Sequence, residues 1–382
     1  MSVTYDLMLR GGTVIDPARD FHGPADVLIH DGLIALAPPG QPAAAEKVLD
    51  ATGCLVLPGL IDFHTHLYFG GTAIGIQPDS ALLPQGVTTA VDQGSTGVNN
   101  FESFYKTVIQ TSQVRIFAHL HSSPAGLATL RRSQEVADPA VFDPAAAARL
   151  FRQFGDRLVG LKIRQSREIV GDYGLAPLAA TVRMAEEIGC RVAVHTTNPP
   201  EEVGQLAALL RSGDIYTHMY QGKGHHIIGD GGKVRQSIRA ARERGVIFDT
   251  ADGRPHYTFA VIRAAIADGF PPDIISTDLV TGGLYDRSLF GLPQVMAKYL
   301  ALGLPLTEVV RACTQTPAAL LGMAGTIGTL APGACADVAV FRLKEAALPL
   351  TDSTGEVLTC RQLPVPQLTI RGGQVVYRNI EW

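Results

Sequence analysis

Four histidines and an aspartate stand at the ends of four short apolar runs of the chain. His64 and His66 end the run GLIDFHTH, where a spacing of two puts both imidazoles on one face of a strand. His195, His218 and Asp278 end three later runs. Taken singly, such a histidine is as often structural as a ligand, and such an aspartate often caps a helix. Histidine and carboxylate are the usual ligands of a catalytic zinc-like ion, so their recurrence at run ends predicts a metal site.

A fifth run, RLVGLKIRQS, carries Lys162 where an apolar residue would be expected. Parallel strands buried on both faces are nearly continuous in Val, Ile and Leu. A desolvated ammonium is costly unless it is paired or chemically altered. Lys162 therefore either extends to water near the strand end or takes part in the chemistry beside the metal site.

The runs that must position these residues alternate with helical patterns between about Pro58 and Leu330. This alternation is typical of βα units around a parallel sheet. Eight units favour an α/β fold of the TIM-type (β/α)8 barrel class over residues 58–330, in which the carboxyl ends of the strands carry the chemistry. An open doubly wound sheet is the rival, but it does not need eight strands. The candidate strands are GLIDFHTH, VTTAVDQG, VRIFAHLH, LVGLKIRQ, RVAVHTTN, IYTHMYQG, VIFDTADG and DIISTDL.

Both ends of the chain read as β structure. YDLMLRGGTVID and ADVLIHDGLIAL are apolar-rich runs near the start, and Asp31-Gly32 splits the second with a tight-turn signal. ADVAVFRL and QLTIRGGQVVYR are similar runs near the end. We expect residues 1–57 and 331–382 to form one small β-sandwich from both chain termini.

The composition limits the classes of partner. Of the 382 residues, 46% are hydrophobic and 18% are charged, which is typical of a globular protein. A formal net charge of −4 without a basic run argues against nucleic acid as a partner. Five cysteines at scattered positions indicate reduced thiols. The first residues lack the pattern of a secretory signal, and no run is long and apolar enough for a membrane helix. These features predict a cytoplasmic protein that does not bind membranes.

In order along the chain, LPGLIDFHTHLY, LKIR, VAVHTTNPP, YTHMY and ISTDL resemble the motifs of the amidohydrolase superfamily of metal-dependent hydrolases. The resemblance covers nearly the whole chain, including GTLAPGACADVAVF near its end. In binuclear members, the lysine that matches Lys162 is carbamylated by CO2 and bridges two divalent metals. The implied ligand set is His64, His66 and Asp278 on the first metal, His195 and His218 on the second, and Lys162 between them.

The resemblance implies a hydrolase that cleaves an amide or ester bond with a metal-bridging hydroxide, while Asp278 moves the proton to the leaving group. The chemistry is consistent, since an ammonium has no lone pair for a metal and a carbamate has two oxygens. Zinc is the default metal, but the same ligands suit manganese, iron, cobalt or nickel. A homo-oligomer is expected only by analogy with such enzymes.

The stretch HLYFGGTAIGIQPDSALLPQGVTTAVDQGSTG resembles the amidohydrolase/deacetylase subgroup, sometimes labelled dihydroorotase-like. The resemblance implies removal of an acetyl group from a small N- or O-acetylated carboxylic acid. Dihydroorotases have an arginine two residues after the second histidine, where this chain has Tyr68. A cyclic-amide hydrolase of the dihydroorotase or hydantoinase kind is the alternative. A non-catalytic scaffold homologue is a further alternative, although such proteins usually lack metal ligands that this chain has.

Three residues are candidates for binding the substrate. Arg164 lies two residues after Lys162 and so faces the same side of the strand, where it either clamps a carboxylate or forms a structural salt bridge. Tyr68 offers its hydroxyl. Lys223, in the loop YQGKGHH, is either a third candidate or a surface lysine.

Other polar residues near the predicted strand ends have less certain roles. His119 and His121 repeat the spacing of the first pair on the third run, where a supporting or substrate role is expected rather than metal binding. His225 and His226 are adjacent, and neighbours in sequence rarely bind one ion together. Asp62 is expected deeper in the barrel, behind the metal ligands.

Overall fold

Seven strands form a parallel sheet that carries the predicted site residues. The computed structural model describes residues 4–36, 43–130, 133, 135–253, 255–286 and 291–382. Each strand of the sheet pairs with the next one along the chain, in the order β12-β11-β10-β9-β8-β7-β6. The strands are β6 (Leu60–Thr65), β7 (Val87–Gln93), β8 (Arg115–His121), β9 (Leu158–Arg164), β10 (Arg191–His195), β11 (Ile215–Thr217) and β12 (Ile247–Asp249).

The eighth run, DIISTDL, lies between β12 and β6 but is not a regular strand, so the expectation of eight strands is wrong in this detail. Ile274 makes a parallel bridge to Asp249 of β12, and Leu279 makes one to Thr65 of β6. The run therefore closes the barrel through single bridges. The local reason is Asp278, whose φ of 53° departs from extended geometry between the two bridges. The structure is a (β/α)8-type barrel with an irregular eighth segment.

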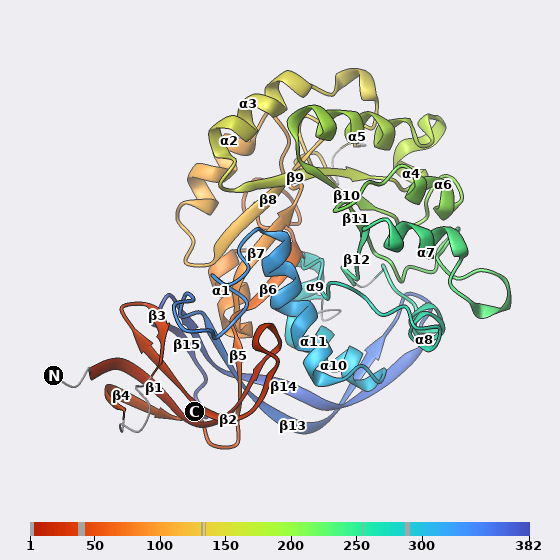
Figure 1. Cartoon of the computed structure of the whole chain (residues 1–382). Helices are drawn as coiled ribbons and strands as arrows, with labels where there is room; N and C mark the ends of the chain where they lie inside the picture. The colour runs from red at the N-terminus through yellow and green to blue at the C-terminus, as the bar shows by residue number, and fades with distance from the viewer. Residues whose placement is uncertain (1–3, 37–42, 131–132, 134, 254, 287–290) are drawn as a thin grey trace.

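Helices follow most of the barrel strands and cover the outside of the barrel (Figure 1). A π-helical turn, Tyr105–Ile109, continues α2. The helices are α1 (Pro78–Leu82), α2 (Phe101–Phe104), α3 (Pro144–Phe154), α4 (Arg167–Val170), α5 (Ala176–Ile188), α6 (Val203–Ala208), α7 (Gln236–Glu243), α8 (Phe259–Ala267), α9 (Thr281–Tyr285), α10 (Leu292–Ala301), α11 (Leu306–Cys313) and α12 (Gln315–Leu320).

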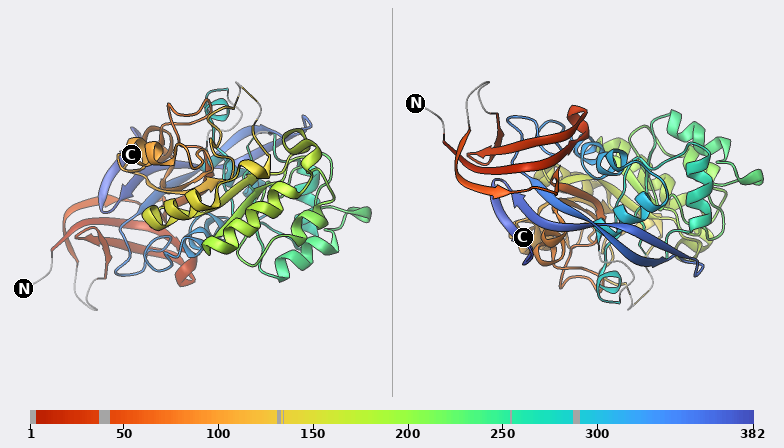
Figure 2. Two further views of the ribbon diagram at one scale, coloured as in Figure 1. Left: turned by 90° about the horizontal axis from the view of Figure 1, so that it is seen from above. Right: turned by 90° about the horizontal axis from the view of Figure 1, so that it is seen from below.

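The two ends of the chain share a second sheet of eight strands. Its order is β15-β14-β13-β5-β1-β2-β3, and β4 pairs with β1. A separate hydrophobic cluster, with residues from both ends such as Leu9, Val56 and Val340, lies inside this sheet. In both views of Figure 2, the two chain termini lie at the end of the molecule that this sheet forms. Its strands are β1 (Thr4–Asp16), β2 (Phe21–His30), β3 (Leu33–Ala35), β4 (Ala44–Asp50), β5 (Leu55–Pro58), β13 (Val338–Thr351), β14 (Val357–Arg371) and β15 (Gln374–Arg378).

The two sheets are held closely together where β5 leads into β6. A single residue, Gly59, connects them, and a Cβ atom there would lie 2.3 Å from Oγ1 of Thr88. The Asp337 carboxylate accepts a 2.7 Å ion-paired hydrogen bond from Nη1 of Arg115 at the start of β8. This contact anchors the terminal sheet to the amino-terminal side of the barrel. The division of the chain into residues 1–57 with 331–382 and residues 58–330 stays a prediction.

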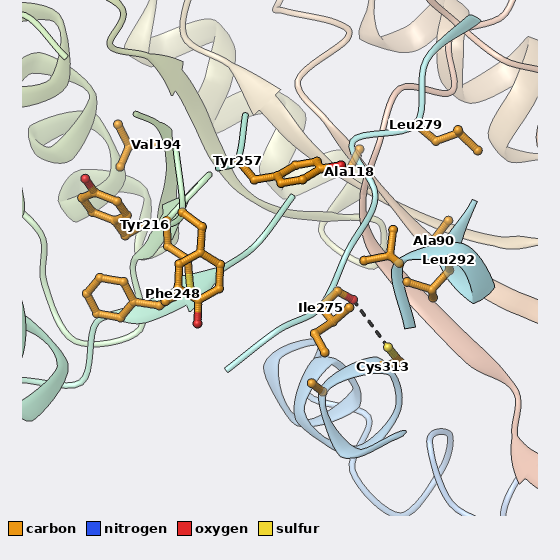
Figure 3. Close-up of a cluster of buried hydrophobic side chains, with 14 of the residues drawn as sticks. Ala90, Ala118, Val194, Tyr216, Phe248, Tyr257, Ile275, Leu279, Leu292 and Cys313 are labelled. Atoms are coloured by element: carbon orange, nitrogen blue, oxygen red, sulfur yellow. Dashed lines mark hydrogen bonds between the residues drawn. The ribbon is translucent and has the colours of Figure 1, made fainter. Parts of the chain in front are cut away.

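The main core lies between the barrel strands and the surrounding helices. Figure 3 shows Val194 of β10, Leu292 of α10 and Cys313 of α11 in this core, and the Cys313 thiol donates to the carbonyl oxygen of Ile275 at 3.7 Å. Across the described residues, no helix combines the length and the apolar character that crossing a membrane would need.

Candidate metal centre

His64 and His66 lie at the carboxyl end of β6 and face Asp278. Nε2 of His64 lies 3.4 Å, and Nε2 of His66 lies 3.2 Å, from Oδ1 of Asp278. On the other side of each ring, Nδ1 of His66 lies 3.0 Å from the hydroxyl oxygen of Ser95. Nδ1 of His64 lies 3.4 Å from Oδ2 of Asp249. Both imidazoles therefore direct Nε2 to Oδ1 of Asp278 and face a polar side chain through Nδ1.

His195 and His218 meet on the neighbouring side of the barrel mouth. Nδ1 of His218 donates to the carbonyl oxygen of Ala251 at 2.6 Å, so its Nε2 keeps a lone pair. This Nε2 lies 2.7 Å from Nδ1 of His195, whose Nε2 lies 3.1 Å from the hydroxyl of Ser166. His218 follows β11 with a φ of 61°, a strained conformation of the kind found at functional sites.

Lys162, on β9, is 2% exposed and does not extend to bulk water. Its Nζ has no hydrogen-bond partner among the described groups. Burial lowers the pKa of Lys162 to about 7, although the charges of Asp278 and Asp249 oppose the change. Gly94 leaves room for the side chain, because a Cβ atom there would lie 2.8 Å from Cβ and Cγ of Lys162. The result is a buried amine without a partner beside four imidazoles.

The electrostatics of the site favour neutral imidazoles. Burial lowers the pKa of His64, His195 and His218 well below 6.5. The next largest cause is the charge of Lys162 for His64 and a neighbouring imidazole for each of the other two. A histidine must be neutral to donate a lone pair to a metal. These side chains are therefore in the protonation state that metal binding needs.

Two groups of donor atoms are compact enough to hold an ion each. One consists of His64, His218 and Asp278, the other of His195, His218 and His256, and the donor atoms within each group lie within 4.8 Å of one another. Imidazoles and a carboxylate around a buried amine without a partner fit a divalent metal centre. The grouping differs from the implied ligand set, because His218 contributes to both groups and His256 joins one of them.

Asp278 presents its two carboxylate oxygens to different parts of the site. Oδ1 faces His64 and His66, whereas Oδ2 lies 3.3 Å from Nε2 of His256. A Cβ atom on Gly253 would lie 2.7 Å from Oδ2, so only glycine leaves this oxygen free of a clash. One carboxylate thus links the first histidine pair to a fifth imidazole.

Reasoning from the sequence missed His256 and Asp249. The His256 ring stacks on His218 at 4.1 Å between centroids, its Nδ1 lies 2.7 Å from Oγ1 of Thr197, and burial lowers its pKa to about 4. Asp249 ends β12, accepts a hydrogen bond from Ser276 at 2.6 Å, and burial raises its pKa to about 8. Its place at a strand end could have identified Asp249, whereas no spacing signal marks His256.

Asp62 and His119 lie deeper in the barrel than the donor groups. Asp62 is fully buried and accepts a hydrogen bond from Oγ1 of Thr277 at 2.7 Å. Burial raises the pKa of Asp62 to about 7. His119 is also fully buried, its ring contacts Phe63, and neither ring nitrogen has a partner among the described groups. Both residues belong to the interior that supports the site.

His121 and His225 contact carboxylates away from the donor groups. Nε2 of His121 lies 3.1 Å from Oε1 of Glu135. Nδ1 of His225 lies 2.9 Å from Oε1 of Glu202. His226 accepts a 3.3 Å hydrogen bond from the backbone N–H of Ile228 through its Nδ1.

A cavity of about 330 Å³ opens above the donor groups. Arg164 lines this cavity and also forms a 2.7 Å ion pair with Glu135. The salt bridge is therefore present, whereas the clamp on a carboxylate stays a prediction. Tyr68 and Lys223 are not among the described lining residues. The Tyr68 hydroxyl donates to Ser103 at 3.0 Å, and Lys223 pairs at 2.6 Å with an exposed glutamate. The described residues that line the cavity are His64, His66, Ile74, Gln93, Leu127, Leu130, Lys162, Arg164, His195, Gly253, Pro255, His256, Asp278, Val280, Gly282, Gly283 and Asp286.

Comparison with known proteins gives matches over most of the chain. The model of the amidohydrolase family matches residues 55–376. A deacetylase of Agrobacterium fabrum is 34% identical over 354 residues, which are 92% of this chain and 86% of the relative. A crystal structure of an adenine deaminase superposes with a TM-score of 0.90 at 28% identity, covering 98% of this chain and 100% of that one. A dihydroorotase structure gives 0.86 at 30% identity, covering 98% of each chain.

Proposed function

The chain belongs to the amidohydrolase family and is a hydrolytic enzyme, and from that premise we propose that it removes the acetyl group of a small N- or O-acetylated carboxylic acid. The observation that carries the proposal is the buried Nζ of Lys162, which has no partner among the described groups and lies beside two groups of donor atoms. The 34% identity to a deacetylase over most of both chains favours acetyl removal over other hydrolytic reactions.

Metal binding is proposed for the residues that the motifs single out. Only a neutral amine can attack CO2, and burial lowers the pKa of Lys162 so that part of it is neutral near pH 7. The amine would add to CO2 by forming an N–C bond and releasing one proton. The two oxygens of this carbamate would join two ions, with zinc as the default and manganese, iron, cobalt or nickel as alternatives. The proposed ligands are His64, His66 and Asp278 for one ion, His195 and His218 for the other, and carbamylated Lys162 between them.

Bound divalent ions would supply Lewis acidity and a water of lowered pKa. The chain itself supplies the proton transfer and the orientation of the substrate. Asp278 would take the proton of the attacking water and pass it to the leaving nitrogen or oxygen. His256, 3.3 Å from Oδ2, holds this carboxylate in place. Leu127 gives the wall of the cavity an apolar part.

A carboxylate on the substrate is proposed because Arg164 lines the cavity. Guanidinium groups bind carboxylates with paired hydrogen bonds. Tyr68 and Lys223, the other two candidates, make polar contacts outside the lining. Arg164 is therefore the favoured partner of the substrate carboxylate.

A cyclic-amide hydrolase remains the second candidate function, because a dihydroorotase structure superposes with a TM-score of 0.86. Against it, Tyr68 stands where dihydroorotases have the arginine that binds their substrate. A scaffold role is disfavoured by the complete set of donor side chains. Self-association and a cytoplasmic location stay predictions, the first testable by sedimentation.

The test is a panel of substrates offered to enzyme reconstituted with zinc. It comprises N-acetyl amino acids and O-acetyl hydroxy acids of both chiralities, with dihydroorotate and hydantoins beside them, and free acetate is measured. We expect acetate release from at least one acetylated acid at a kcat/KM above about 10⁴ M⁻¹ s⁻¹, an ordinary enzymatic value. Turnover of the cyclic compounds alone would exclude the deacetylase function. A folded protein that never retains stoichiometric metal would favour the scaffold.

A further inference from the structure

Arg164 is held by a chain of buried contacts that begins at His121. The backbone N–H of Ser123 donates to Nδ1 of His121 at 3.0 Å, so the ring proton is on Nε2. That nitrogen faces Oε1 of Glu135 at 3.1 Å. The second oxygen of Glu135 accepts a 2.7 Å hydrogen bond from Nη1 of Arg164. Glu135 thus contacts His121 through one oxygen and Arg164 through the other. The His121 side chain is 0% exposed and that of Glu135 is 5% exposed.

The contact with Glu135 fixes one nitrogen of the Arg164 guanidinium and leaves its other N–H groups without a contact to Glu135. Only Nη1 of Arg164 contacts Glu135 among the described contacts, whereas a guanidinium has five N–H donors. The Arg164 side chain is 21% exposed and lines the cavity. It is the one arginine among the described lining residues. The structure therefore holds the Arg164 guanidinium through Nη1 at the wall of the cavity.

Part of the wall of the cavity that Arg164 lines is apolar. Leu127 and Leu130, in the turns after β8, line the cavity. The backbone N–H of Leu127 donates to the carbonyl of Ser95 at 3.1 Å, and Ser95 also contacts a metal-site histidine. A Cβ atom on Gly126 would lie 2.6 Å from the backbone of Thr96. This close approach of two backbones fixes Leu127 before any substrate arrives.

We propose that Glu135 is a positioning residue that holds Arg164 for the substrate carboxylate, and that Leu127 and Leu130 receive an apolar substituent of the same substrate. The inference rests on the proposed deacetylase function and deepens it. The substrate class is an acetylated carboxylic acid whose third substituent is a hydrocarbon group. A preorganised cation binds its partner more tightly because less conformational freedom is lost. The apolar wall adds burial of the hydrocarbon surface.

Variant Glu135→Gln tests the positioning role. It keeps the shape of the side chain but removes the charge that holds Arg164. The assay measures acetate release from N-acetyl-leucine and from its methyl ester, which lacks the carboxylate charge. We expect the ratio of kcat/KM for acid over ester to fall about tenfold, mainly through KM. Glu135→Asp, which keeps the charge, should recover part of the ratio. Glu308→Gln, which removes a surface partner of Arg311, is the matched control and should leave the ratio unchanged.

The apolar wall is tested with N-acetyl-leucine against N-acetyl-asparagine, which have side chains of similar size. We expect at least a tenfold preference for leucine, reduced severalfold in Leu130→Asn, a change at a partly exposed position. The positioning role would be overturned if Glu135→Gln lowered kcat/KM equally for the acid and the ester, or if it raised the ratio of the two values. Equal use of the two side chains by the wild type would overturn the apolar class. In both of these outcomes the enzyme still releases acetate. If the proposed deacetylase function itself is wrong, no compound in the panel releases acetate.

Discussion

Replacing Lys162 with methionine would separate the chemistry of this lysine from its packing. Methionine is unbranched and apolar and fills a similar space. Because the lysine is buried and its Nζ has no partner among the described groups, we expect the variant to lose metal and yet gain stability in the metal-free state. The two effects have opposite signs, and a generally damaged protein would not produce both.

The gain in stability follows from the lowered pKa of Lys162. Burial lowers this pKa from its ordinary value of 10.5 to about 7. Each factor of ten in proton affinity is worth about 1.4 kcal/mol, so the folded protein is destabilised by on the order of 4 kcal/mol at pH 7. Between pH 7 and 10.5 the unfolded chain binds a proton that the folded chain does not, so wild-type stability rises with pH. The gap between variant and wild type should therefore close by about pH 10.5.

Urea unfolding of chelator-treated protein in CO2-free buffer measures this gap at pH 7 and pH 10. Metal analysis of untreated protein should give two ions per chain for the wild type and at most one for Lys162→Met, with most activity lost. Lys223→Met, at an exposed ion pair, is the matched control and should change stability by less than about 1 kcal/mol. A methionine variant that is less stable than wild type at pH 7, or that keeps two ions, would refute the reasoning.

Three further changes test other parts of the site. Asp278→Asn should lower kcat by about 10²–10⁴-fold without unfolding the protein, as measured by steady-state kinetics and circular dichroism; near-normal kcat would remove Asp278 from proton transfer. Asp249→Asn should weaken metal binding by about 10–100-fold in a chelator competition, because Asp249 lies 3.4 Å from Nδ1 of His64; unchanged affinity would contradict this orienting role. Lys298→Met should destabilise the protein by about 3–5 kcal/mol in urea, because it leaves Asp252 buried without the cation that lies 2.5 Å away; a neutral effect would mean that water reaches Asp252.

The class of fold and the main donor side chains could be predicted from local patterns. Alternation of apolar runs with helices reflects the periodicities of strands and helices, which act over a few residues. The same periodicity put His64 and His66 on one face of β6. The irregular eighth segment could not be predicted, because the φ of 53° at Asp278 goes with a backbone hydrogen bond to His64, more than 200 residues earlier in the chain.

The sequence by itself determined which residue types stand at the strand ends and in what order, since these follow from composition and short-range spacing. It placed Lys162 inside an apolar run but left open whether the side chain extends to water, and the structure decided for burial. Only the tertiary structure decided that His256 stacks on His218 and that Glu135 joins His121 to Arg164. Those contacts link strand ends and loops that are far apart in the sequence. How closely these approach depends on barrel closure, which is a property of the whole packed core.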